Sequence, residues 1–382
     1  MDNCWIEFTT KTNKPYWFNI ITNKSTFQKP SMVKDRGLLK IPPNWERVKS
    51  RTQNKFYFYD RTSNTTQWSL PFPDDQCNKS LSWTGNSCYM DSILQSIFGP
   101  GVDNTLAQEI LYANLNFDTR KNLCDIKYRE IIQSKLREIS NTIQNISKKD
   151  INNVKEFRKV LRNCPYRGAV IEEQFYGTEM RDAGEFLSYI LNFFPISDKA
   201  VRKENKYVTN EGEELKLIDE SIDYKSSIII NINWQTLLLS EGLSLENFLI
   251  DELESKFDTP FTVEKYPGKF THRFTSRKIL DSPAIIFSLE RLTLLKNITD
   301  NDDDGETYYI DKKINVPNRI NLTSGKSLNL SAIVIYETAH YTCYFKCKNE
   351  WYYYNDIATS KIIKQELDKK FIGKQGTQYF YT

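Results

Sequence analysis

Apolar residues recur at helical spacing directly after Cys88. The segment 80–98 reads SLSWTGNSCYMDSILQSIF, and its apolar positions after the cysteine are three or four residues apart or adjacent: Met90, Ile93, Leu94, Ile97 and Phe98. This period predicts an amphipathic helix. Gly85 and Asn86 interrupt regular structure just before it. The pattern therefore places Cys88 at the N-terminus of a helix.

A second pattern, alternation, covers residues 330–356. It predicts a strand over 330–336, a strand over 340–347, a turn at 348–350 and a strand over 351–356. His340 then begins one strand, while Asn355 and Asp356 end its antiparallel neighbour. We expect a side-chain oxygen there to accept the Nδ1–H of His340 and leave Nε2 to face a thiol.

The first 71 residues contain an internal repeat of aromatic and β-branched segments separated by polar turns. Each copy predicts three short antiparallel strands. A unit this small needs an aromatic buckle, which Trp5 with Pro30 and Trp45 with Pro71 can supply. The remaining aromatics could hold a proline-rich peptide, or they could simply be core: Tyr16 and Phe27 in the first copy, Tyr57 and Trp68 in the second.

Composition narrows the function classes. With 52 basic and 49 acidic residues among 382, there is no strong field for a nucleic acid or an anionic membrane. No apolar run could span a bilayer, and the start resembles no secretory signal. The seven cysteines include no CxxC pair, so we expect neither a disulfide framework nor a four-cysteine zinc site. These features indicate a reducing intracellular compartment, the cytoplasm or nucleus. The abundance of Asn, Lys and Ile is typical of AT-rich coding sequences, such as those of some large DNA viruses.

Candidate chemistry centres on Cys88 and His340. A thiol at a helix N-terminus has a lowered pKa, and the free backbone N–H groups there can stabilise an oxyanion. The alternatives are a buried structural cysteine and an ordinary strand histidine. The other histidine, His272, lies in a polar stretch, and we interpret it as structural.

The segment around Cys88 resembles the cysteine box of the ubiquitin-specific protease family. The matching positions are Gly85, Asn86, Cys88, Tyr89, Met90, Ser92, Leu94 and Gln95. Two positions depart from the family pattern. Trp83 stands where the family has its oxyanion-hole Asn, and Asp91 replaces a usual Asn. The oxyanion donors are therefore expected to be the backbone N–H of Cys88 and the side chain of Asn86.

Other segments carry the same resemblance. The histidine box matches at His340, Tyr341, Trp351, Tyr354, Asn355 and Asp356. The resemblance implies Asn355 as the third triad member, with Asp356 as a second acid beside it. Residues 181–187 resemble a family helix whose acidic side chains bind the substrate's basic tail. That role would fall to Asp182 and Glu185, three apart on one helix face, unless they are only solvated charges.

The two N-terminal copies resemble WW domains. The second copy matches well, whereas the first has Phe27 in place of the second Trp. Ile20 and Arg61 stand where the family has a histidine.

Together these resemblances imply an α+β, papain-like cysteine protease core preceded by two small all-β WW modules. The expected domains are 1–31, 41–72 and 80–382. The implied activity is removal of ubiquitin without a metal or organic cofactor, with proline-rich segments as WW partners. Two alternatives stay open, namely a protease for another ubiquitin-like modifier and an inactive binding scaffold. The polar blocks 202–216 and 299–306 are expected to be surface loops.

Overall fold

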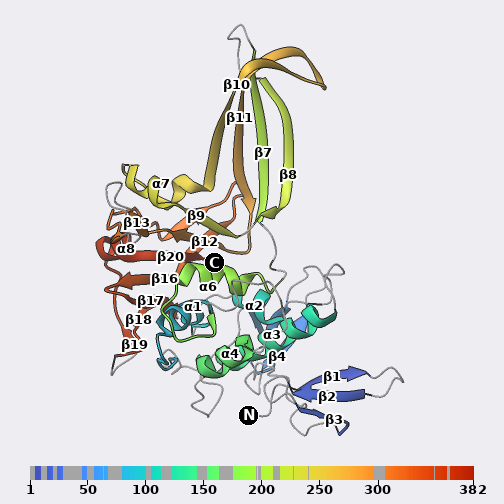
Figure 1. The fold of residues 1–382 in the computed structure, drawn as a ribbon, viewed down its shortest axis with the longest axis vertical. Helices are drawn as coiled ribbons and strands as arrows, with labels where there is room; N and C mark the ends of the chain where they lie inside the picture. The colour runs from blue at the N-terminus through green and yellow to red at the C-terminus, as the bar shows by residue number, and fades with distance from the viewer. Residues whose placement is uncertain are drawn as a thin grey trace, which may run out of the picture. The chain divides into compact units, whose positions relative to one another are not determined.

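A computed structural model shows how the chain folds, and its elements are labelled in Figure 1. The structure describes residues 5–9, 15–19, 24–28, 45–49, 56–62, 64–67, 80–99, 105–112, 115, 123–143, 153–162, 175–194, 196, 199–209, 216–226, 228–239, 241–295, 306–347, 349–358 and 362–382. The expected loop at 299–306 lies almost wholly outside them. Two compact units emerge: unit 1 comprises residues 1–196 and 331–367, and unit 2 comprises residues 197–330 and 368–382.

The N-terminal repeat forms two separate antiparallel sheets of three strands, as predicted. The first contains β1 (Trp5–Thr9), β2 (Pro15–Asn19) and β3 (Lys24–Thr26). The second contains β4 (Trp45–Lys49), β5 (Phe56–Asp60) and β6 (Thr65–Gln67). Phe58 of β5 is fully buried. The expected buckle pairs, Trp5 with Pro30 and Trp45 with Pro71, involve side chains outside the described residues.

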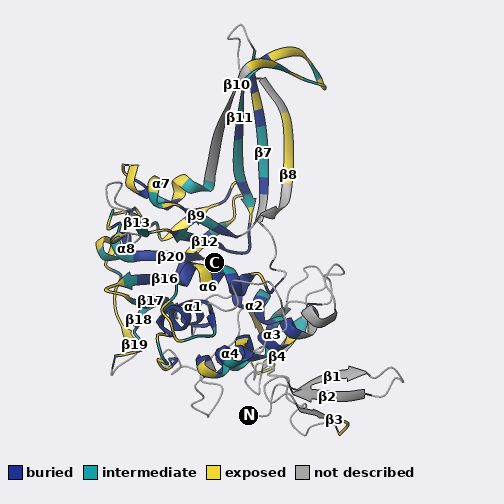
Figure 2. Ribbon diagram, viewed as in Figure 1, coloured by how far each residue is buried: buried dark blue, intermediate teal, exposed yellow. Residues whose placement is uncertain are grey.

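Helices make up much of the rest of unit 1. They are α1 (Cys88–Phe98), α2 (Thr105–Tyr112), α3 (Leu123–Ile143), α4 (Asn153–Arg162) and α6 (Ala183–Leu191). All eleven residues of α1 are buried, including its polar ones (Figure 2). The predicted helix is therefore a central element, buried on its polar as well as its apolar face, and its polar side chains must find partners inside the protein.

Unit 1 also contains the predicted C-terminal strands. They are β16 (Ser327–Glu337), whose first residues belong to unit 2, β17 (His340–Cys347), β18 (Glu350–Tyr354) and β19 (Ile362–Lys364). Their pairing is antiparallel throughout. Thr338 and Ala339 form the β16–β17 turn with positive φ angles of 49° and 60°. This geometry resembles a type I′ hairpin turn, and β17 begins directly after it at His340.

Unit 2 has a buried sheet in which β12 (Ile285–Leu289) lies between β9 (Ile229–Ile232) and β20 (Gly376–Tyr381). Around it lie α7 (Trp234–Leu239), the 3-10 helix η3 (Leu245–Leu249), β13 (Leu292–Leu295), β14 (Glu306–Tyr309), β15 (Arg319–Asn321) and α8 (Lys369–Gln375). The Arg291 guanidinium is buried and donates to the backbone carbonyls of Gly376, Ile310, Lys312 and Gly373.

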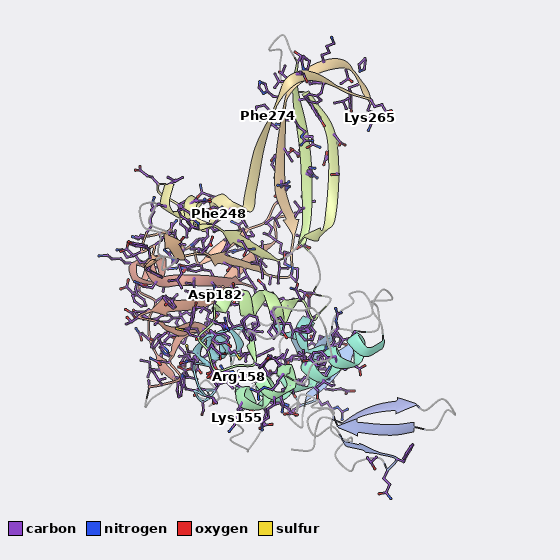
Figure 3. All side chains as sticks on the ribbon, in the orientation of Figure 1. Lys155, Arg158, Asp182, Phe248, Lys265 and Phe274 are labelled. Carbon is purple, nitrogen blue, oxygen red and sulfur yellow. The ribbon has the colours of Figure 1, made fainter. Side chains whose placement is uncertain are left out.

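Unit 2 also holds a long four-stranded antiparallel sheet. Its order is β10 (Ile250–Val263), β11 (Tyr266–Asp281), β7 (Lys199–Thr209) and β8 (Lys216–Ser226). Figure 3 labels Lys265 in the β10–β11 turn and Phe274 on β11. The expectation of a surface loop over 202–216 was wrong, because residues 202–209 belong to β7 and Lys216 begins β8. The strands were missed because residues 202–216 are mostly charged or polar and show no regular alternation of apolar and polar positions.

Candidate active site

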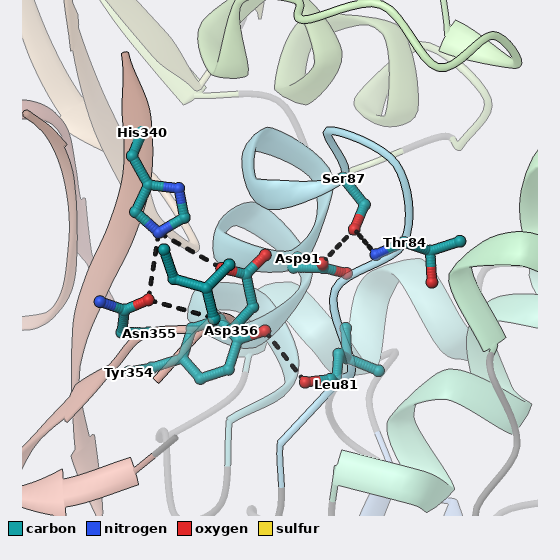
Figure 4. Close-up of polar contacts among 9 residues, drawn as sticks. Leu81, Thr84, Ser87, Asp91, His340, Tyr354, Asn355 and Asp356 are labelled. Carbon is teal, nitrogen blue, oxygen red and sulfur yellow. Dashed lines mark hydrogen bonds and ion pairs between the residues drawn. The ribbon is translucent and has the colours of Figure 1, made fainter. Parts of the chain in front are cut away.

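The N-terminus of α1 carries Cys88 without a side-chain cap. Ser87 occupies the N-cap position but makes no cap hydrogen bond. Its hydroxyl instead accepts from the backbone N–H of Thr84 at 2.8 Å and donates to Asp91 Oδ2 at 2.5 Å (Figure 4). Because no cap competes for them, backbone N–H groups of the first turn can serve a developing negative charge.

The loop before Cys88 is fixed from two sides. Gly85 and Asn86 have positive φ angles of 48° and 51°. Arg158 of α4, labelled in Figure 3, donates from Nη1 to the carbonyls of Thr84 at 2.7 Å and Gly85 at 2.8 Å. On the other side, Asn86 Nδ2 donates to the Thr178 carbonyl at 2.9 Å. The side chain of Asn86, a predicted oxyanion donor, is thus engaged in a hydrogen bond to the Thr178 loop. The backbone N–H of Cys88 is therefore the better candidate for the oxyanion donor.

The Cys88 thiol is 3% exposed, and burial raises its pKa. Hydrogen bonds from the backbone N–H groups of Tyr341 and Tyr89 lower that pKa, while the charges of Asp356 and Asp91 raise it further. The expectation of a lowered pKa was wrong for this resting structure, because desolvation outweighs the helix terminus. A thiol with a raised pKa needs a base to become a nucleophile at neutral pH.

His340 lies at the start of β17, as predicted, and meets both expected partners. Its Nε2 is 3.1 Å from Asn355 Oδ1 and 3.3 Å from Asp356 Oδ1 (Figure 4). The backbone N–H of Ile357 also donates to Asn355 Oδ1, at 3.2 Å. The predicted ring orientation was wrong, since Nε2 rather than Nδ1 faces the orienting oxygens. Nδ1 therefore remains to act on a thiol, and the tautomer carrying Nε2–H fits this contact.

Asp182 precedes α6 as its N-cap, with Oδ1 accepting from the Glu185 N–H at 2.9 Å, so it lies next to Glu185 at the first turn of the helix. Asp182 Oδ2 accepts from the Tyr341 hydroxyl at 3.0 Å. This bond joins α6 to the residue after His340. Glu185 is exposed, and its pKa is raised by partial desolvation and by Asp182.

Two buried carboxyl groups lie beneath the site. Asp91 is 0% exposed and Asp356 is 2% exposed. Burial raises the pKa of Asp91 well above its usual range, as do the charge of Asp356 and a hydrogen bond with it. The sequence signalled Asp91 only as a departure from the family's Asn. Neither the contact with Asp356 nor the role of Arg158 carried any signal in the sequence.

The remaining residues that the sequence analysis singled out differ in their exposure and pairing. Trp83 is 46% exposed. His272 pairs with Lys256 on the polar sheet of unit 2, as its structural interpretation allows. Phe27 is exposed and Tyr57 is half-buried. The side chains of Tyr16 and Trp68 lie outside the described residues.

Cys343 is a free buried thiol, whereas Cys347 is disulfide-bonded, which the sequence did not predict.

Within the described residues, no cluster of three or more His, Cys, Asp or Glu residues could hold a metal ion. None of the helices in the described part of the chain has the length and apolarity needed to cross a membrane.

Comparisons with known proteins agree with this geometry. Residues 80–381 match the family described as ubiquitin carboxyl-terminal hydrolase, and residues 41–71 match the WW domain. No curated protein matches the sequence.

Solved structures with a similar fold include the SAGA DUB module Ubp8/Sgf11/Sus1/Sgf73 bound to monoubiquitin (TM-score 0.55, 14% identity) and bound to ubiquitin aldehyde (0.55, 15%). A yeast SAGA DUB module gives a TM-score of 0.51 at 14% identity. Each match covers 85% of this chain and 78% of the other. The predicted α+β, papain-like fold is confirmed. The chain belongs to the ubiquitin carboxyl-terminal hydrolase family and is a cysteine-type deubiquitinase.

Proposed function

We propose that Cys88 is the nucleophile and His340 the general base of this deubiquitinase, oriented by Asn355 and Asp356. The observation that carries the proposal is the hydrogen-bond arrangement of His340. Its Nε2 is held by Asn355 at 3.1 Å, which leaves Nδ1 as the only ring nitrogen for the thiol. The Cys88 sulfur receives a hydrogen bond from the N–H of Tyr341, the residue next to His340.

The reaction then follows from these atoms. His340 Nδ1 takes the thiol proton while Cys88 Sγ attacks the carbonyl carbon of the terminal glycine of ubiquitin. The backbone N–H of Cys88 stabilises the oxyanion. His340 returns the proton to the departing lysine amine, leaving a thioester. Water then attacks the thioester, with His340 taking its proton and giving it to the sulfur. The raised pKa of Cys88 makes this base assistance necessary.

Asn355 and Asp356 are proposed to have different roles. Asn355 Oδ1 is the closer acceptor and has no charge, so it fixes the ring and its tautomer. Asp356 is buried and offers the charge that stabilises the imidazolium formed during attack. Asp182 and Glu185 are proposed to attract the basic tail of the substrate, with Asp182 limited by its bonds to Tyr341 and Glu185.

The WW modules are proposed to recruit proline-rich partners and so raise their effective concentration at the catalytic domain. The second module has Tyr57 half-buried on β5 and an ion pair of 2.7 Å between Arg61 and Glu46. Arg61 stands where the family has a histidine, so the ligand need not resemble that of other WW domains. Titration with proline-rich peptides should show binding that Tyr57→Ala weakens.

The test of the catalytic roles is hydrolysis of ubiquitin carrying a C-terminal fluorogenic amide. His340→Ala should lower kcat by about 10²- to 10⁴-fold, the usual worth of a general acid–base group. His272→Ala is the matched control, because His272 lies on the polar sheet, and it should keep wild-type kcat. Hydrolysis of another ubiquitin-like modifier in place of ubiquitin would favour the first alternative. Binding of a modifier without hydrolysis would favour the scaffold.

A further inference from the structure

Asp91 is a buried acid that the proposed mechanism does not use. It lies on α1, three residues after Cys88, and is fully buried. Its Oδ2 accepts from the Ser87 hydroxyl at 2.5 Å. Its Oδ1 is equally inaccessible and has no hydrogen-bond donor among the described residues. A buried carboxylate oxygen without a donor is costly, and a proton on the carboxyl group removes that cost.

The group that faces Asp91 is another carboxyl. The charge of Asp356 raises the pKa of Asp91, and Asp356 Oδ1 lies 3.3 Å from His340 Nε2 (Figure 4). Two neighbouring carboxylates that are shielded from water cannot both be ionised cheaply, and one of them keeps a proton. Asp356 faces the histidine, which favours its charged form. The proton therefore belongs on Asp91.

The other charged and titratable groups around Asp91 are few. Arg158 stabilises its ionised form, but burial is the larger influence and raises its pKa. Cys88, Cys343 and Tyr354 each have a pKa raised by the negative charge of Asp91, so none of them would stabilise that charge.

We propose that Asp91 is a positioning residue whose protonated carboxyl group donates a hydrogen bond to Asp356 and holds the Asp356 carboxylate toward His340. This inference rests on the proposed role of His340. An Asn amide at residue 91 could make the same contacts, donating from Nδ2 to Asp356 and accepting from Ser87 with Oδ1. A carboxyl group reproduces that pattern only while protonated. The contact therefore depends on pH in this chain.

The sign of that dependence follows from linkage. The pKa of Asp91 in the folded protein lies above its unfolded value of about 3.9. Its contribution to stability is fully present at a pH below its pKa in the unfolded protein. That contribution is lost as the pH rises through its pKa in the folded protein. Between these two pKa values, wild type should therefore take up about one more proton on folding than Asp91→Asn does.

The experiment compares the full-length wild type, Asp91→Asn and Asp91→Ala. Hydrolysis of ubiquitin with a C-terminal fluorogenic amide is measured from about pH 5 to about pH 9.5, a range that brackets histidine and thiol titration. Asp91→Ala should lose about 100-fold in kcat with a smaller change in KM, as expected for a misplaced reacting group. Asp91→Asn should recover most of that loss and retain its activity further into alkaline pH than wild type.

Urea unfolding over the same pH range provides a readout that does not need activity. Stability should fall more steeply with rising pH in wild type than in Asp91→Asn. Asp281→Asn, which makes the same change at an exposed site, should keep the wild-type slope. Parallel slopes for wild type and Asp91→Asn would overturn the proposal, as would a folded Asp91→Asn no more active than Asp91→Ala. If wild type hydrolyses no ubiquitin, the proposed function fails, and the unfolding slopes still decide whether Asp91 holds the proton.

Discussion

Two sheets of this protein show opposite ways of stabilising β-structure. In the sheet that carries His340, β17 is buried along most of its length, and Phe345 packs against Gly99 at the end of α1. In the four-stranded sheet of unit 2, most described residues of β11 are exposed or half-buried. There a buried hydrogen bond of 2.9 Å joins Thr275 to Asn205, and charged pairs such as Arg202–Glu220 lie across strands. The first sheet depends on apolar burial, whereas the second has only a small buried aromatic cluster, Tyr207 with Phe270, besides its backbone pairing and polar contacts.

The largest effect on stability is expected from Phe345→Ala. The side chain is fully buried, so its removal should lower the free energy of unfolding by about 3–5 kcal/mol. Lys346→Ala, at the half-buried next position of the same strand, is the control and should change it by about 0.5 kcal/mol or less. Urea unfolding measures both. Equal effects of the two substitutions would contradict the claim that apolar burial stabilises this sheet.

A smaller effect is expected from Thr275→Val in the polar sheet. The change keeps the shape but removes the donor to Asn205 Oδ1, which should cost about 1–3 kcal/mol. Thr262→Val, at an exposed position of β10, is the matched control and should be nearly neutral. The same unfolding measurement applies. A neutral Thr275→Val would show that the Thr275–Asn205 hydrogen bond does not stabilise this sheet.

The smallest effect is expected from Arg202→Ala. Its ion pair with Glu220 has a separation of 2.9 Å, but both side chains are about 40% exposed, so the pair should contribute about 0–1 kcal/mol. Whatever it contributes should shrink as salt rises from about 0.05 M to about 1 M. A loss as large as that of Phe345→Ala, or one independent of salt, would contradict the account.

The same contrast explains what the sequence could predict. The three strands around His340 were predicted because apolar burial leaves a periodic pattern. The bounds of β17 were right, but β16 begins three residues earlier than predicted and β18 ends at Tyr354, so Asn355 and Asp356 follow that strand. Residues 202–216 were not recognised as strands because they are mostly charged or polar and show no regular alternation of apolar and polar positions. At the site, Cys88 and His340 were predictable from motifs, whereas the ring orientation of His340 depends on how Asn355 is presented by β18. The rise in the pKa of Cys88 also depends on tertiary burial, which no local pattern contains.

The most direct test of the central claim is labelling with ubiquitin that carries a C-terminal electrophile. The full-length wild type should form a covalent adduct with one ubiquitin, and Cys88→Ala should form none while unfolding at a comparable urea concentration. Cys343→Ala tests the other free described thiol and should still label, since that thiol is buried and its pKa is raised. An adduct that persists in Cys88→Ala, or no adduct in wild type, would contradict the assignment of Cys88 as the nucleophile that acts on ubiquitin.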